Sequence, residues 1–201
     1  FPIGGPFTAA SFLTGFDRSL AYLVTEPGFA QRLLRIQTEY CLAIGKRCVE
    51  AGVKIVFIND DLGYVSGPFV SPSLFRRTVL PHLQRLTHGL KKRGAKVLLH
   101  CDGDIRLLLD DLVSMGIDGL HPIERKCNMS LKEVKERYGD RICLLGNVDA
   151  SSLLPFGAPE EVKRQTLECI GVAGPGGGYI LASDHSIHPS VPGEKARFMF
   201  Q

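Results

Sequence analysis

The chain has 201 residues, of which 44% are hydrophobic and 22% are charged, and its formal net charge is +3. These values are typical of a globular protein with one core and exclude a disordered or low-complexity chain. Lys and Arg are interspersed with acidic residues and form no dense basic run, which disfavours a nucleic-acid-binding protein. We therefore expect a small molecule, and no nucleic acid, as the partner.

The cysteines indicate an intracellular protein. They are scattered along the chain without a CxxC pair, at positions Cys41, Cys48, Cys101, Cys127, Cys143 and Cys169. This spacing favours reduced thiols over a secreted disulfide framework. No signal-peptide pattern opens the chain, and no apolar run approaches the roughly 20 residues that span a bilayer. The sequence therefore predicts a soluble cytoplasmic protein with no membrane partner.

The expected elements alternate between strand and helix from the start of the chain. A weak strand near Phe7 comes first, and apolar residues at three-to-four spacing then predict an amphipathic helix over 27–52. Short apolar runs predict buried strands over 53–58 and 96–99. Between these strands, a Ser-Pro pair supplies the N-cap and first residue of a helix over 71–94.

The second half of the chain repeats this alternation. Its predicted helices cover 105–115, 130–139 and 159–170, and its predicted strands cover 118–123, 141–145 and 179–181. Ser130 and Glu133 form a capping box at the start of the middle helix. The segment from Pro192 onward begins a last helix.

The alternation predicts an α/β fold with a parallel sheet, and polar residues after nearly every strand favour a TIM-type (β/α)₈ barrel with its site at one rim. Such a barrel has eight strands and typically ~250 residues. Only about six βα units are found over 1–201. We therefore predict a single, incomplete barrel domain that lacks its N-terminal strands and is the C-terminal portion of a longer chain.

Ionisable residues gather where the predicted strands end. They are Asp60, Asp61, His100, Asp102, Asp104, Glu124, Asp149, Asp184 and His185. If His185 faces His100 and Asp102 across the barrel, the set suits Zn²⁺, or another divalent transition metal, with one open position. The alternative is structural, because Asp and His at strand ends often hydrogen-bond in turns, cap helices or hold loop amides. Cys101 is expected to point into the core.

Several segments resemble the uroporphyrinogen decarboxylase superfamily and look most like its corrinoid-dependent methyltransferases and their uncharacterised relatives. These segments are FINDDLG at 57–63, Ser71-Pro72, HCDG at 100–103, KERYGDRI at 135–142, GNVD at 146–149 and GGYILASDH at 177–185. The resemblance implies a distorted (β/α)₈ barrel. It also implies a zinc site, which the methyltransferases build from a His-x-Cys pair and a later Cys. Here His100 matches the His, while Asp102 and His185 stand where the two Cys would be.

This substitution of ligands shapes the expected activity, because a metal without thiolate ligands is a harder Lewis acid and a thiol acceptor is disfavoured. The resemblance then implies metal-dependent methyl transfer between a small O- or N-methyl substrate and a corrinoid on a partner protein. The expected catalytic residues are Glu124, Asp149 and Asp61, with Glu124 or Asp149 as proton donor. The expected substrate-binding residues are Asp60, Asn147 and Asp184.

Two other readings stay open. In the first, the protein is a uroporphyrinogen-type decarboxylase of tetrapyrrole biosynthesis, which needs no metal and in which His185 matches an active-site His. The mainly acidic strand ends disfavour the polycarboxylate substrate of that reaction. In the second, the chain is a non-catalytic barrel fragment that binds a partner through its open sheet edges. The resemblance also makes a homodimer an expectation.

Overall fold

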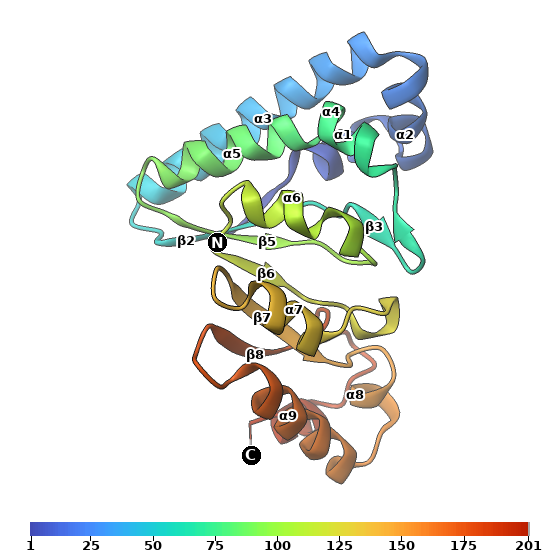
Figure 1. Ribbon diagram of the computed structural model, residues 1–201, viewed down its shortest axis with the longest axis vertical. Helices are drawn as coiled ribbons and strands as arrows, with labels where there is room; N and C mark the ends of the chain where they lie inside the picture. Colours follow the sequence, from blue (N-terminus) through green and yellow to red (C-terminus); the bar gives the residue numbers. More distant parts are fainter. Residues whose placement is uncertain (201) are drawn as a thin grey trace.

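The computed structural model describes residues 1–200, and its centre is a parallel sheet with the strand order β1-β2-β5-β6-β7-β8 (Figure 1). The strands are β1 Pro2–Gly4, β2 Ile55–Asn59, β5 Lys96–His100, β6 Gly119–His121, β7 Cys143–Val148 and β8 Tyr179–Ser183. A small antiparallel hairpin of β3 Gly63–Tyr64 and β4 Gly67–Pro68 follows β2. The six parallel strands confirm the partial TIM-type fold expected from the sequence.

The helices lie between the strands in chain order. They are α1 Pro6–Thr14, α2 Phe16–Thr25, α3 Pro27–Glu50, α4 Pro72–Thr78, α5 Leu80–Lys91, α6 Leu109–Ser114, α7 Leu131–Tyr138, α8 Leu153–Phe156, α9 Pro159–Ala173 and α10 Gly193–Phe198, with 3₁₀ turns η1 Arg106–Leu108 and η2 Arg125–Cys127. Helix α3 packs on α5, and α7 packs on α9. Within residues 1–200, no helix combines the length and the apolar character needed to cross a bilayer.

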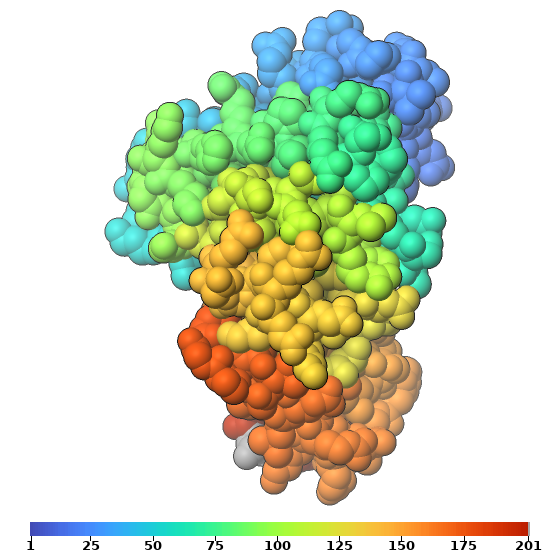
Figure 2. Space-filling model, in the orientation of Figure 1, coloured from blue at the N-terminus to red at the C-terminus, as the bar shows by residue number. Residues whose placement is uncertain are grey.

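The sheet stays open, with β1 at one edge and β8 at the other. Figure 2 shows an elongated molecule, with blue and green segments at one end, yellow segments in the middle and orange segments at the other end. The core lies between the sheet and the helices and is built from side chains that are fully buried, among them Leu83, Leu86, Leu90, Val97, Leu99, Leu112 and Leu144. The rigid strands leave their carboxyl ends at one rim, where the site residues follow them.

The first strand lies slightly earlier than expected, because β1 covers Pro2–Gly4 and pairs with 57–59, whereas Phe7 itself lies buried in α1. Pro6 occupies the first helical turn, where its fixed φ and missing N–H are tolerated. The Asp60 carboxylate then accepts hydrogen bonds from the amides of Phe7 and Thr8 at 3.3 and 2.6 Å. A side chain more than fifty residues away therefore begins this helix.

The single helix expected over 71–94 is wrong, because the chain forms α4 and α5 with Val79 between them. Pro81 has no N–H to donate to the carbonyl four residues earlier, so one continuous helix would lose a hydrogen bond and gain a clash at this point. Ser71 caps α4 as expected, and its hydroxyl accepts a hydrogen bond from the Leu74 amide.

Candidate metal centre

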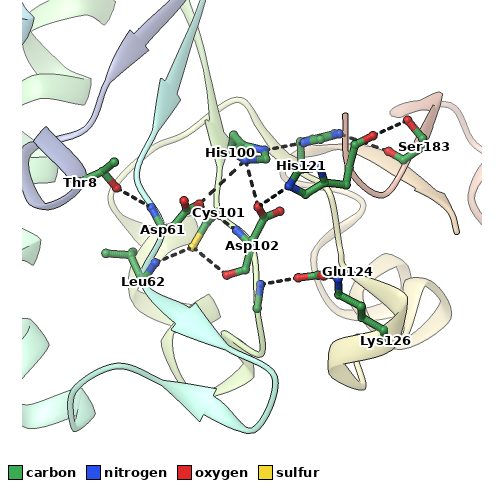
Figure 3. Close-up of polar contacts among 12 residues, drawn as sticks. Thr8, Asp61, Leu62, His100, Cys101, Asp102, His121, Glu124, Lys126 and Ser183 are labelled. Carbon is green, nitrogen blue, oxygen red and sulfur yellow. Dashed lines mark hydrogen bonds and ion pairs between the residues drawn. The ribbon is translucent and has the colours of Figure 1, made fainter. Parts of the chain in front are cut away.

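Neighbouring strands bring the site residues together at the rim. The register of the sheet places Asn59 of β2 opposite His100 of β5, and His100 opposite His121 of β6. The imidazole rings of His100 and His121 stack at a centroid distance of 5.0 Å, and their Nδ1 atoms lie 2.8 Å apart (Figure 3). The other edge of the His100 ring faces the carboxylates that follow β2 and β5.

The structure places the three residues of the expected metal set at the same rim, but His185 contacts Asp102 from outside the compact group of ligand atoms that His100 and Asp102 form with Asp61. Nε2 of His100 lies 3.5 Å from Oδ2 of Asp102, and Nε2 of His185 lies 3.3 Å from the same oxygen. Asp61, which the sequence marked as catalytic, joins them with Oδ1 3.9 Å from Nε2 of His100. One ligand atom from each of Asp61, His100 and Asp102 falls within 4.8 Å of the others.

The turn after β5 depends on Gly103. Its φ is +89°, and a Cβ at this position would lie 2.3 Å from the carbonyl carbon of Gly63. Any side chain here would therefore push the β3 segment away. The tight packing keeps the backbone amide of Asp102 3.2 Å from Oδ1 of Asp61, so the turn and the two carboxylates are held as one unit.

The donor atoms fit a divalent cation. Oδ1 of Asp102 is buried and has no hydrogen-bond partner, which is costly for a carboxylate unless a ligand compensates it. Imidazole nitrogen and carboxylate oxygen are both ordinary ligands of Zn²⁺ and of Mn²⁺, Fe²⁺ or Ni²⁺. An ion between these atoms would offset the repulsion between the carboxylates of Asp61 and Asp102.

The neighbouring carboxylates favour the protonated form of His100. Burial alone would lower the pKa of His100, but the hydrogen bond and charge of Asp102 and the charge of Asp61 raise it. Burial would likewise raise the pKa of Asp102, but contact with His100 and the charge of His185 lower it. Burial raises the pKa of Asp61, and the nearby Asp102 charge adds to this effect. His121 behaves oppositely, because burial and the His100 charge lower its pKa to about 4.

His121 is the site residue that the sequence reasoning missed. Nε2 of His121 lies 3.3 Å from the backbone oxygen of Ser183 in β8, so the ring connects His100 to the strand that precedes His185. A signal was present in the sequence, because His121 ends its strand as His100 ends the preceding one. The predicted strand continued to Ile123, so His121 was placed inside the strand and not at its end. Cys101 is buried as expected, and its sulfur accepts a hydrogen bond from the Leu62 amide.

Glu124 and Asp149, the expected proton donors, occupy different surroundings. Glu124 is buried beside the cluster, where its oxygens accept hydrogen bonds from the Gly103 amide at 2.8 Å and from Lys126 at 3.0 Å (Figure 3). Asp149 accepts hydrogen bonds from the amides of Ser151 and Ser152 after β7. Burial would raise the pKa of Asp149, but the hydrogen bonds from these serines lower it.

The three expected substrate-binding residues are buried and bond mainly to backbone. Asp60 caps α1, and burial raises its pKa to about 7. The Asn147 amide donates to the carbonyl of Ile123 and accepts from Arg125. Asp184 accepts a hydrogen bond from the Ala150 amide, its second oxygen has no partner, and burial raises its pKa to about 6. None of these three side chains contacts the ligand atoms around His100 within residues 1–200.

The chain is similar to several known proteins. Residues 2–201 match the family described as uroporphyrinogen decarboxylase (URO-D). The uroporphyrinogen decarboxylase of Alkalilimnicola ehrlichii is 27% identical over 98% of this chain and 54% of that protein. The methylcobamide:CoM methyltransferase MtaA of Methanosarcina barkeri is 28% identical over 96% of this chain and 54% of that protein.

A solved structure supports the fold. A methyltransferase from Methanosarcina mazei superposes with a TM-score of 0.84 at 28% identity, and the match covers 99% of this chain and 56% of that one. The chain thus spans about half the length of the relatives it matches. The similarities confirm the resemblance drawn from the motifs, and both decarboxylases and methyltransferases occur among the relatives at nearly equal identity.

Proposed function

Since the chain belongs to the uroporphyrinogen decarboxylase family, we propose that it serves metal-dependent methyl transfer between a small O- or N-methyl substrate and a corrinoid carried by a partner protein. One observation carries the proposal. Nε2 of His100 and the carboxylates of Asp61 and Asp102 converge at the rim, and Oδ1 of Asp102 is buried without a hydrogen-bond partner. The similarity to a methylcobamide:CoM methyltransferase supports the choice of reaction class and of a corrinoid.

His100, Asp102 and His185 would hold the ion, which we propose to be zinc or another divalent transition metal, and Asp61 would supply a further carboxylate. When bound, such an ion acts as a Lewis acid toward the heteroatom that carries the methyl group. No thiolate takes part in this donor set, which favours an oxygen or nitrogen leaving atom over a sulfur nucleophile.

Glu124 is the better placed of the two expected proton donors. It lies one hydrogen bond from the turn that carries Asp102, through the Gly103 amide, whereas Asp149 is engaged by two serine amides after another strand. Asp184 keeps one unpartnered oxygen for a substrate group. Asp60 and Asn147 would act on the substrate only indirectly, through the segments that they hold.

Metal analysis tests the proposal on the full chain. We expect divalent metal in the wild type, and its loss in His100→Ala and His185→Ala. Asp111→Asn is the matched control, because Asp111 of α6 pairs with Arg76 of α4 and takes no part in the cluster around His100. With metal restored, the wild type should consume free cob(I)alamin in the presence of an O-methyl or N-methyl donor. Unchanged metal content in both histidine variants would exclude this site.

Decarboxylation is the second candidate, because a uroporphyrinogen decarboxylase is nearly as similar to this chain as the methyltransferases are. Turnover of uroporphyrinogen by chelator-treated protein would favour it. A non-catalytic role would show neither activity, and self-association through the open edges β1 and β8 would then appear in size-exclusion measurements. The cytoplasmic location and the homodimer remain predictions.

A further inference from the structure

We propose that His121 is a positioning residue that determines which nitrogen of His100 is free to bind the metal. This inference rests on the proposed metal site but concerns a side chain outside the expected ligands. It is carried by three contacts that connect β5, β6 and β8: the ring stacking, the Nδ1 to Nδ1 contact and the contact with Ser183.

The first step is set by the backbone of β8. The oxygen of Ser183 can only accept a hydrogen bond, so Nε2 of His121, at 3.3 Å, must carry the proton. A neutral imidazole has one N–H group, which leaves Nδ1 of His121 as an acceptor. A carbonyl oxygen in β8 thereby defines the tautomer of a side chain in β6.

In the second step, the tautomer of His121 determines which nitrogen of His100 donates a hydrogen bond. The two Nδ1 atoms are 2.8 Å apart and can share only one proton between them. Because Nδ1 of His121 accepts, Nδ1 of His100 donates. The reverse order would require a charged His121, yet within residues 1–200 the carboxylates within 4.0 Å of these rings pair with His100 and not with His121.

The result is a fixed orientation for His100. Its Nδ1 faces His121, so its Nε2 faces Asp61 and Asp102, where a cation would replace the Nε2 proton. Ligating histidines generally use their second nitrogen in such a bond, and loss of the outer partner typically costs about 10–100-fold in metal affinity. Since His121 also contacts the strand that precedes His185, it aligns both histidine ligands.

Two substitutions test this role in the full chain. His121→Phe keeps an aromatic ring but removes both hydrogen bonds, and we expect Zn²⁺ affinity to fall by about 10–100-fold. His121→Asn retains an acceptor toward His100 and should restore most of that affinity. His82→Phe is the matched control, because His82 is a half-buried histidine that bonds to Thr38 and Gln31 away from the rim. Equal Zn²⁺ affinity in wild type and His121→Phe would overturn the inference.

Nitrogen-15 NMR of the metal-free wild type gives an independent measurement that needs no variant to fold. Near neutral pH, His121 should carry its proton on Nε2, with Nδ1 unprotonated. A proton on Nδ1 of His121 would overturn the inference even if metal binds. Conversely, a wild type that binds no divalent metal contradicts the proposed function, while the NMR result still decides the orientation of the two rings.

Discussion

His100 and Asp102, at the end of β5, bond through their side chains to other side chains, whereas Asp149 and Asp184, after β7 and β8, accept mainly backbone amides. His100 contacts Asp102 and His121 through side-chain atoms alone. Asp149 instead accepts the amides of the turn that follows it, and Asp184 accepts the amide of Ala150. The same kind of residue at the same rim of one sheet therefore has two different surroundings.

The difference separates structural carboxylates from candidate ligands. A carboxylate that accepts backbone amides in a turn or cap stabilises the local fold. A cluster that places two carboxylates near one imidazole and leaves Oδ1 of Asp102 without a partner opposes folding unless a ligand compensates it. Asp60 and Asp61 show both cases in consecutive residues, because the first caps α1 and the second faces His100.

The largest expected effect is on the pH dependence of stability and arises from Asp60, one of the carboxylates that accept backbone amides. Burial raises its pKa from 3.8 to about 7, so the folded state binds a proton more tightly than the unfolded state. This contribution to the free energy of unfolding is complete below about pH 4. It is lost as pH rises through 7, and the loss is on the order of 4 kcal/mol. Denaturant unfolding across this range should show the decline in wild type and not in Asp60→Asn.

Asp111→Asn controls for the general effect of removing a carboxylate and should keep the wild-type pH dependence. If wild type and Asp60→Asn have parallel stability curves between pH 4 and 7, Asp60 titrates as an ordinary exposed carboxyl. Asp60 could then not be classed as a buried structural carboxylate that differs from the candidate metal ligands.

The second effect is on the metal affinity of the cluster formed by Asp61, His100 and Asp102. Asp102→Asn keeps the size of the side chain but removes the charge that His100 and His185 share. We expect Zn²⁺ affinity to fall by more than the roughly 100-fold that an outer partner can cost, measured by competition with a chromogenic chelator. Asp104→Asn is the matched control, since Asp104 is a carboxylate of the same loop that pairs with Arg106. Similar affinities in the two variants would argue against the cluster as the metal site.

The sequence predicts the strands better than it predicts the contacts at their ends. Apolar runs such as 96–99 identify buried strands, because their periodicity and length depend on local residues. The helix at Phe7 was missed because its cap, Asp60, lies far along the chain. His100, Asp102 and His185 were found from strand-end positions, but His121 was not, since its role depends on the register between β5 and β6.

A third prediction tests whether the carboxylate after β7 is structural. Asp149→Ala removes the acceptor for the Ser151 and Ser152 amides, which should lower the free energy of unfolding by about 1–2 kcal/mol. Zn²⁺ affinity should not change. Asp17→Ala, an exposed carboxylate in the first turn of α2, should change stability by no more than about 0.5 kcal/mol. A loss of metal affinity in Asp149→Ala would extend the site to β7.

The smallest expected change in stability is that of Asp61→Asn. It should have the opposite sign to the change caused by removing a carboxylate that caps a turn or helix. Asp61→Asn removes a carboxylate that lies beside Asp102, while an amide oxygen can still accept the Asp102 N–H. Because Asp61 is nearly half exposed and its charge is screened, we expect the metal-free protein to gain only a few tenths of a kcal/mol in unfolding free energy. The same substitution should weaken Zn²⁺ binding, since it removes a charged donor. Thermal unfolding with and without Zn²⁺ measures both effects, and a variant that is less stable without metal would place Asp61 with Asp60 among the structural carboxylates.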